Sequence, residues 1–341
     1  MRQDETPQPV VAAGTDRTTG SPRRWLRTLD VGSMQQVALV AVCLLLGILM
    51  QIYFPRFLSG PNIEVTLTNF VTEGIMALGM TIVMITGGID ISVAATLQFS
   101  AIVVAMLLRA GVPVPAAIAL TLLLAAMVGL LNASLINLFK VHPFIVTLAT
   151  LLTLRGVDLV ITGGTSISGL PDAFTTIGQD RLFGIRTSLL IFMVLALIIG
   201  YALRNHRYLQ QAYFIGGNRR AARMSGIKVE RFMLFAFVLN AVLAGIAGII
   251  VCSQYGAASV SYGQNAELRV IAATAIGGTS FSGGSGTISG TVLGVLFLAM
   301  IYNAFNMSGI NTYWQDVAIG VMLLAAVFLG EYLKRRRIAR A

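Results

Sequence analysis

Residues 204–231 read RNHRYLQQAYFIGGNRRAARMSGIKVER and hold seven Lys/Arg but a single acid, Glu230. This charged segment stands between apolar runs that are long enough to cross a bilayer, about 20 residues each. The 341-residue chain is 56% hydrophobic and only 11% charged, whereas soluble domains carry about 25% charged residues. The pattern predicts an all-α polytopic membrane protein in which 204–231 is a cytoplasmic loop.

Hydropathy and loop composition divide the chain into three parts. Residues 1–33 are polar and read as a disordered cytoplasmic tail, 34–333 as the transmembrane domain, and 334–341 as a basic cytoplasmic C-terminus. We expect about ten spans, some of them broken or re-entrant, near 35–54, 65–86, 93–109, 115–138, 143–162, 187–203, 232–252, 266–281, 286–306 and 313–333.

The distribution of basic residues predicts the orientation. With both termini inside, 18 Lys/Arg lie in cytoplasmic segments and four lie outside. Cytoplasmic loops of membrane proteins carry such an excess, so the chain is predicted N-in and C-in. The same rule accounts for the net charge of +10 without nucleic acid as a partner.

Within the charged loop, one short segment has the signals of a separate helix. Asn218 can cap a helix over residues 219–225 and Gly226 can end it. Ala221 and Ala222 would offer a small face to a partner. We interpret 218–226 as a docking helix for another protein. The alternative is a solvated basic loop that the positive-inside rule alone explains.

Residues 86–92, TGGIDIS, predict a first broken helix. Gly87 and Gly88 interrupt an apolar run, and Asp90 and Ser92 place polar groups at the interruption. Backbone freed in this way must face protein or a water-filled cavity, and an acid at membrane depth is a candidate for function. The alternative for Asp90 is a helix cap, and the two roles are compatible.

Residues 267–286, ELRVIAATAIGGTSFSGGSG, predict a second break at Gly277, Gly278, Gly283 and Gly284. The apolar part is short for a span, which favours a tilted or re-entrant helix. Glu267 and Arg269 stand two residues apart and cannot face each other on a helix, so each needs another partner. For Arg269, an ordinary interfacial charge is the favoured interpretation.

Two further patterns concern packing. Gly286, Gly290 and Gly294 form a GxxxGxxxG stripe, which lets helix backbones approach closely in a membrane. Arg155 and Asp158 stand three residues apart on one helix face and are expected to form a structural pair. These residues are assigned to structure and not to transport.

Polar residues within the apolar runs are candidates for a solute path. Sugar sites combine hydrogen-bonding groups with apolar contact surfaces, and the second span offers such a mixed face around Glu73. The candidates, each with core packing as the alternative, are Asn69, Phe70, Glu73, Asp90, Ser92, Gln98 and Phe99.

Motifs of catalysis and cofactor binding are missing from the sequence. We find no GxxxxGK[ST] loop, no HExxH and no arrangement of a nucleophile with a base. Cys43 and Cys252 lie far apart in apolar runs, so neither a metal site nor a disulfide is expected. These absences argue against an enzyme.

Four ordered blocks resemble the permease subunit of ABC importers of the ribose type, a branch that includes autoinducer-2 permeases. They are GGIDISV at 87–93, HPFIVTLATLLTLRG at 142–156, YFIGGNRRAARMSGI at 213–227 and ELRVIAATAIGGTSFSGGSGTISGTVLG at 267–294. The resemblance covers nearly all of the chain beyond the N-terminal tail. Two positions depart from it, since the family usually has Gly where this chain has Ala94 and Asp where it has Arg269.

The resemblance implies a bacterial inner-membrane importer for a small sugar or sugar-like solute. Its partners would be an ATPase subunit that binds ATP and Mg²⁺, a second permease copy or paralogue, and an external substrate-binding protein. The ATPase would dock on a coupling helix at 218–226. The expected ATPase-coupling residues are Gly216, Gly217, Asn218, Arg219, Arg220, Ala221, Ala222, Arg223, Ser225 and Gly226.

Two other functions remain open at this point. An ion-coupled secondary transporter would use Glu73, Asp90 or Asp158 as a proton or sodium site, but it would leave the docking helix without a role. A channel-like or scaffolding membrane protein would need neither a binding protein nor ATP.

Overall fold

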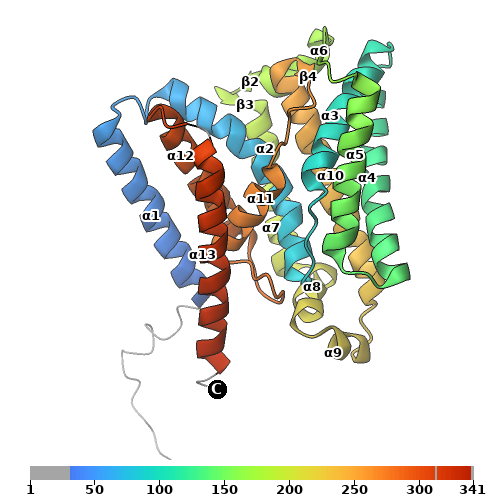
Figure 1. The fold of residues 1–341 in the computed structure, drawn as a ribbon, viewed down its shortest axis with the longest axis vertical. Coiled ribbons are helices and arrows are strands. Elements are labelled where there is room, and N and C mark those ends of the chain that lie inside the picture. Colours follow the sequence, from blue (N-terminus) through green and yellow to red (C-terminus); the bar gives the residue numbers. More distant parts are fainter. Residues whose placement is uncertain (1–30, 312, 339–341) are drawn as a thin grey trace, which may run out of the picture.

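The computed structural model describes residues 31–311 and 313–338, and this part of the chain is mostly helical (Figure 1). The predicted tail 1–33 lies outside it except for Val31–Ser33, which begin the first helix. The long helices are α1 (Val31–Tyr53), α2 (Gly60–Ile85), α3 (Val93–Arg109), α4 (Val114–Phe139), α5 (Pro143–Thr162), α7 (Thr187–Asn205), α10 (Val229–Tyr255), α12 (Ile288–Met307) and α13 (Tyr313–Ile338). The short helices are α6 (Asp172–Gln179), α8 (Arg207–Gly217), α9 (Arg219–Met224) and α11 (Ala266–Ile276).

Each of the ten predicted spans coincides with a helix, and seven of these are long and apolar enough to cross a membrane. The prediction of a polytopic helical membrane protein is confirmed in this form. Among the others, α11 has 11 residues and is about 16 Å long at 1.5 Å per residue. It is too short to cross a hydrocarbon core of about 30 Å.

The core of the molecule surrounds α2 and α10. Most residues of both helices are buried, and α10 packs on α2, α3 and α4. In contrast, α1, α4, α5 and α7 expose rows of large apolar side chains such as Leu44, Leu123 and Leu197. A helix that is apolar all round needs lipid or protein on every face, so these outer faces suit a bilayer.

The two ends of the molecule differ in composition and structure (Figure 1). At one end lie α8 and α9, together with the start of α1 and the end of α13. At the other end lie α6 and four two-residue strands, β1 (Ile167–Ser168), β2 (Arg181–Leu182), β3 (Ile185–Arg186) and β4 (Ala257–Ala258). Antiparallel pairing joins β1 to β4, with Ile167 opposite Ala258, and β2 to β3 in a hairpin.

The first predicted break is present between α2 and α3. Gly87 has φ +76°, a conformation that favours glycine, and residues 86–92 fold back beside α2. Asn240 of α10 contacts both sides of this reversal. It packs against Gly79 of α2, and its amide donates a hydrogen bond to Asp90, 2.9 Å away. Asp90 therefore lies level with the interior of α2 and not beyond its end.

The second break separates α11 from α12. Gly290 and Gly294 of the predicted glycine stripe pack against α11, whereas Gly286 lies before the first residue of α12 and is not part of a helical face. A Cβ at Gly290 would lie 2.0 Å from the carbonyl oxygen of Gly277, and a Cβ at Gly294 2.1 Å from that of Ala273. These distances allow no side chain, so α11 and α12 meet backbone to backbone. From the neighbouring α1, Gln35 donates to the carbonyl of Ile276, the last residue of α11.

Candidate functional site

The predicted short helix exists as α9. The side-chain oxygen of Asn218 accepts hydrogen bonds from the backbone N–H groups of Arg220 and Ala221, both at 3.0 Å. Gly226 follows the helix with φ +82°. One expectation was wrong: Ala222 is buried inside this chain, and only Ala221 is exposed. The surface that α9 offers is therefore mainly that of its arginines and Met224.

Helix α8, which precedes α9, was not predicted from the sequence. Leu209, Ala212 and Ile215 form its buried face, and Tyr208 packs against the rings of Phe232 and Phe235. The spacing of these buried residues, three apart, is the helical signal that the surrounding charges obscured. Through this face α8 holds α9 against the body of the molecule.

At the end of α8, three glycine-containing segments meet with almost no side chain between them. We call this contact the glycine junction: Ile85–Gly87, Gly216–Gly217 and Gly283–Gly284. A Cβ on Gly216 would lie 1.9 Å from the carbonyl oxygen of Ile85 and 2.4 Å from the N of Gly284. The N–H of Gly284 donates to that same Ile85 carbonyl at 2.8 Å. The junction thus joins both broken segments to the base of α9.

Two side chains from α8 and α9 reinforce the glycine junction. The Arg219 guanidinium donates to the carbonyl of Thr86 at 3.3 Å, and burial followed by the nearby charge of Arg223 lowers its pKa. The Tyr213 hydroxyl donates to the carbonyl of Gly286 at 2.9 Å. Burial raises the pKa of Tyr213, which keeps this donor protonated.

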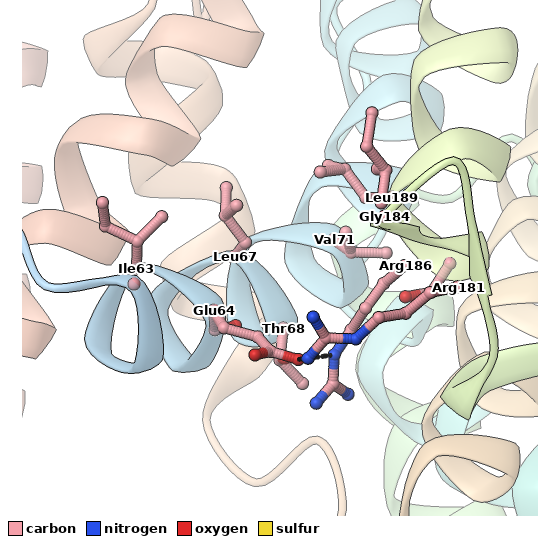
Figure 2. A pocket seen from close by; sticks show the side chains of 12 residues that line it. Ile63, Glu64, Leu67, Thr68, Val71, Arg181, Gly184, Arg186 and Leu189 are labelled. Carbon is pink, nitrogen blue, oxygen red and sulfur yellow. Dashed lines mark hydrogen bonds and ion pairs between the residues drawn. The ribbon is translucent and has the colours of Figure 1, made fainter.

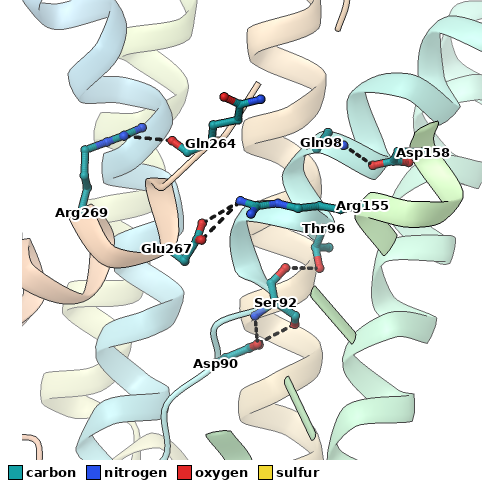
Figure 3. Close-up of polar contacts among 9 residues, drawn as sticks. All are labelled: Asp90, Ser92, Thr96, Gln98, Arg155, Asp158, Gln264, Glu267 and Arg269. Carbon is teal, nitrogen blue, oxygen red and sulfur yellow. Dashed lines mark hydrogen bonds and ion pairs between the residues drawn. The ribbon is translucent and has the colours of Figure 1, made fainter. Parts of the chain in front are cut away.

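The predicted path residues Asp90, Ser92 and Gln98 are buried and take part in two separate sets of hydrogen bonds (Figure 3). Asp90 accepts from the N–H and the hydroxyl of Ser92, at 3.0 and 2.6 Å. Asn132 donates to the Ser92 hydroxyl at 2.9 Å. Gln98 donates to Asp158 at 2.8 Å. The expected pair of Arg155 with Asp158 was therefore wrong, since Asp158 takes its partner from α3.

The first turn of α11 carries two ion pairs that point in different directions. Glu267 pairs with Arg155 of α5 at 3.1 Å, as Figure 3 shows. Arg269 pairs with Glu73 of α2 at 2.5 Å. The expectation that Glu267 and Arg269 have separate partners is confirmed. The interpretation of Arg269 as an interfacial charge was wrong, because its side chain is only 22% exposed and points into the protein.

The Glu73–Arg269 pair borders a polar cavity of about 230 Å³. Five of its lining residues carry amide or hydroxyl groups on side chains from α2, α12 and α13, and one is a phenol. The lining consists of Val65, Thr66, Asn69, Glu73, Arg269, Ala299, Tyr302, Asn303, Asn306 and Gln315.

Of the seven predicted path residues, Asn69 and Glu73 line this polar cavity. Phe70 is buried and packs edge-on against Phe192, with ring centroids 4.9 Å apart. Phe99 packs against the apolar core. The cavity also contains Tyr302 and Asn303, which the sequence analysis did not single out, because nothing local marks which face of α12 meets α2.

A second cavity lies between α2 and the β2–β3 hairpin, and Figure 2 shows it from close by. Its walls are mostly apolar, with Ile63, Leu67 and Leu189 among them. At one edge Glu64 accepts from both Arg181 and Arg186, at 2.6 and 2.5 Å. This cluster holds the hairpin to α2 at the end of the molecule opposite α9.

Comparison with known proteins identifies the family of this chain. A model described as "Branched-chain amino acid transport system / permease component" matches residues 62–327. The ribose import permease protein RbsC of Bacillus subtilis (strain 168) is 38% identical over 300 residues, which cover 87% of this chain and 93% of the relative. The autoinducer 2 import system permease protein LsrC of Escherichia coli (strain SMS-3-5 / SECEC) is 34% identical, over 87% and 90%. The chain belongs to this permease family.

These matches confirm the interpretation as the membrane subunit of an ATP-driven importer over the ion-coupled alternative, and as a transport subunit and not an enzyme. RbsC of Escherichia coli (strain K12) is 35% identical over 300 residues, which cover 87% of this chain and 93% of the relative. Comparison with solved structures gave no match. Among the described residues, no group of three His, Cys, Asp or Glu could hold a metal ion.

The two departures from the family pattern now have structural settings. Ala94 is buried in the first turn of α3, where helical backbone suits alanine at least as well as glycine. Arg269 stands opposite Glu73 at the edge of the polar cavity. The first departure requires nothing from its surroundings, whereas the second places a charge where it changes the electrostatics of the cavity.

Proposed function

We propose that this permease moves a small sugar or sugar-like solute into a bacterial cytoplasm, from an external binding protein and at the expense of ATP hydrolysed by a separate subunit. ATP and Mg²⁺ bind that ATPase, and a second permease copy or paralogue completes the pathway. The names of the relatives, ribose and autoinducer 2 permeases, support this class of solute. The chain crosses the inner membrane about ten times, with both termini inside. The crossing that begins with the short α11 is completed by the glycine-rich segment that follows it and reaches the glycine junction.

The glycine junction is the observation that carries the coupling mechanism. An ATPase that binds the exposed arginines of α9 also moves α8, because Asn218 alone separates the end of α8 from the start of α9. Gly216 contacts Ile85 and Gly284 without side chains that could rearrange, so the displacement reaches both broken segments. An ordinary side-chain contact can relax by changing rotamer; this contact has no such freedom.

Alternating access then follows from two arrangements of the broken segments. The ATPase stabilises one arrangement through α9, and its nucleotide state determines which is favoured. The loaded binding protein docks at the opposite end, on the surface of 163–186 that contains α6 and the β2–β3 hairpin. Each partner thus biases the same equilibrium from its own side of the membrane.

The test is co-purification of the tagged permease from mild detergent, with identification of bound proteins. We expect an ATPase subunit with the wild-type chain and its loss when residues 218–226 are scrambled. Replacing Gly217 and Arg220 together should abolish stimulation of the ATPase while the permease still inserts. Unchanged transport by that double variant, or solute transport by the permease alone without ATP, would refute the proposal.

A further inference from the structure

The polar cavity between α2, α11, α12 and α13 has the size and lining of a small-solute site. Its volume of about 230 Å³ lies below the roughly 300–1,000 Å³ of drug-sized pockets, which limits the occupant to a small molecule. Side-chain amides dominate the lining, and each offers both donors and acceptors. Hydroxyl groups of a solute, which also donate and accept, match such a surface.

The amides of the cavity wall are held in place before any solute arrives. Asn303 exchanges hydrogen bonds with Asn62, both at 2.9 Å. Gln315 donates to the Asn306 side chain at 2.8 Å. A wall fixed by its own hydrogen bonds binds with a smaller entropy loss than a mobile one.

Two groups in the cavity retain unused hydrogen-bonding capacity. The Tyr302 hydroxyl is buried and has no hydrogen-bond partner among the described residues. The Arg269 guanidinium stacks over the Tyr302 ring, 5.8 Å from its centroid, and Nε and Nη1 donate to Glu73 and to the Gln264 carbonyl. The Nη2 donors are left for a ligand, because a guanidinium has five N–H groups in all.

We propose that this cavity is a solute site in which the Glu73–Arg269 pair selects uncharged, polyhydroxylated solutes over both anions and cations. The proposal rests on the transport function above and adds its selecting residues. Arg269 alone would attract an anion and Glu73 alone a cation. Paired at 2.5 Å, each cancels the other's field at the solute while both can still bind hydroxyl groups.

Single neutral substitutions test the pairing, because each uncovers one charge. Glu73→Gln leaves Arg269 uncompensated, and Arg269→Gln leaves Glu73 uncompensated. The double substitution removes both charges and returns the cavity to neutrality. Tyr302→Phe removes the unpartnered hydroxyl without touching the pair. Glu64→Gln is the matched control, because Glu64 also lies on α2 and pairs with arginine, but it is outside the polar cavity.

The measurement is equilibrium binding of radiolabelled D-ribose, D-gluconate and D-glucosamine to the purified full-length permease in nanodiscs. We expect the wild type and Glu64→Gln to prefer ribose. Glu73→Gln should raise the gluconate-to-ribose affinity ratio at least about tenfold, because the uncompensated Arg269 attracts the anion. Arg269→Gln should raise the glucosamine-to-ribose affinity ratio similarly, because the uncompensated Glu73 attracts the cation. The double variant should restore the ribose preference, and Tyr302→Phe should weaken ribose binding severalfold without changing either ratio.

Unchanged ratios in both single variants, or the absence of saturable ribose binding by the wild type, would overturn the assignment of the site. If one single variant fails to fold, the other single variant and Tyr302→Phe still decide, because the proposal requires a changed affinity ratio in the first and weaker ribose binding in the second. The transport proposal is judged separately by ATPase co-purification. If the ATPase co-purifies but the affinity ratios of both single variants stay unchanged, the assignment of the solute site is refuted and the transport proposal stands.

Discussion

At the scale of single residues, Gly216 shows how a missing side chain allows a close contact between backbone segments. It occupies the end of a helix where its backbone contacts the ends of two other segments, and any Cβ would overlap the Ile85 carbonyl at 1.9 Å. Its neighbour Gly217, in the same helix, has nothing within 4 Å of such a Cβ. Adjacent glycines thus have opposite tolerance to the same methyl group.

Gly216→Ala should lower the thermal unfolding midpoint of the purified permease, because both nearest atoms are backbone and cannot swing away. Overpacking of this kind costs about 1–3 kcal/mol. Gly217→Ala is the control and should leave the midpoint within experimental error. Light-scattering-detected unfolding in detergent measures both. Equal midpoints for the two variants would contradict the contact described at the glycine junction.

Asn218 illustrates the contribution of a cap to a helix of only six residues. Asn218→Ala removes the acceptor for two backbone N–H groups and should cost about 1 kcal/mol of helix stability. We expect weaker ATPase co-purification at unchanged permease yield. Asn218→Asp keeps the acceptor and should restore the interaction. A loss that aspartate fails to rescue would assign Asn218 to direct contact with the partner and not to capping.

At the scale of elements, α11 is a short helix that is held in place by contacts with several other helices. It packs on α2, α12 and α13, while Glu267 reaches away from these to Arg155 on α5. Glu267 is 9% exposed in its side chain and Arg155 29%, so water screens the pair only partly. The pair therefore ties α11 to a helix with which it shares little other packing surface.

Arg155→Glu should destabilise the permease on the order of 1–3 kcal/mol, because it leaves two like charges in a half-buried site. Exchanging both charges, with Arg155→Glu and Glu267→Arg together, should recover most of the loss. A double-mutant cycle on the unfolding midpoint measures the coupling. Additive effects of the two substitutions would show that the pair contributes nothing to stability.

The close approach of α11 and α12 gives a second test at this scale. Gly294→Ala would place a methyl group 2.1 Å from the Ala273 carbonyl oxygen and should separate the two helices, with a cost of about 1–3 kcal/mol. Gly320→Ala in α13 meets nothing within 4 Å and is the control. Unfolding midpoints that drop equally in both variants would point to a cause other than helix contact.

Sequence patterns predicted the helices well because their signals are local. Apolar runs gave the positions of the spans, and Asn218 with Gly226 gave the limits of α9. They failed where the answer depended on distant parts of the chain. Arg155 was assigned to the nearest acid, Asp158, but its partner Glu267 is 112 residues away. Likewise, nothing near Gly216 in sequence reveals that it contacts both Ile85 and Gly284.

At the scale of the whole molecule, the arrangement of helices makes a prediction about the membrane. The basic end with α8 and α9 should face the cytoplasm and the end with α6 and the strands the exterior. Two exposed positions report on this: Met224 in α9 is 83% exposed and Phe183 in the β2–β3 turn 91%. The native Cys43 and Cys252 are both buried, so they give little background to thiol reagents.

A membrane-impermeant maleimide should label Phe183→Cys in intact cells and Met224→Cys only after the cells are opened. The wild-type chain, with its two buried cysteines, is the control and should stay unlabelled in both conditions. Mass shift on a gel reads the result. Labelling of Met224→Cys from outside would reverse the proposed orientation and remove α9 from the side where an ATPase could bind.

The glycine junction has an evolutionary consequence. Its three segments touch through main-chain atoms, which every amino acid shares, whereas the polar cavity is lined by side chains. Substitutions can therefore change the chemistry of the cavity, residue by residue, without altering the main-chain contacts through which α9 is proposed to act. Related permeases can therefore differ in the solute they transport while they keep the same backbone contacts at the glycine junction.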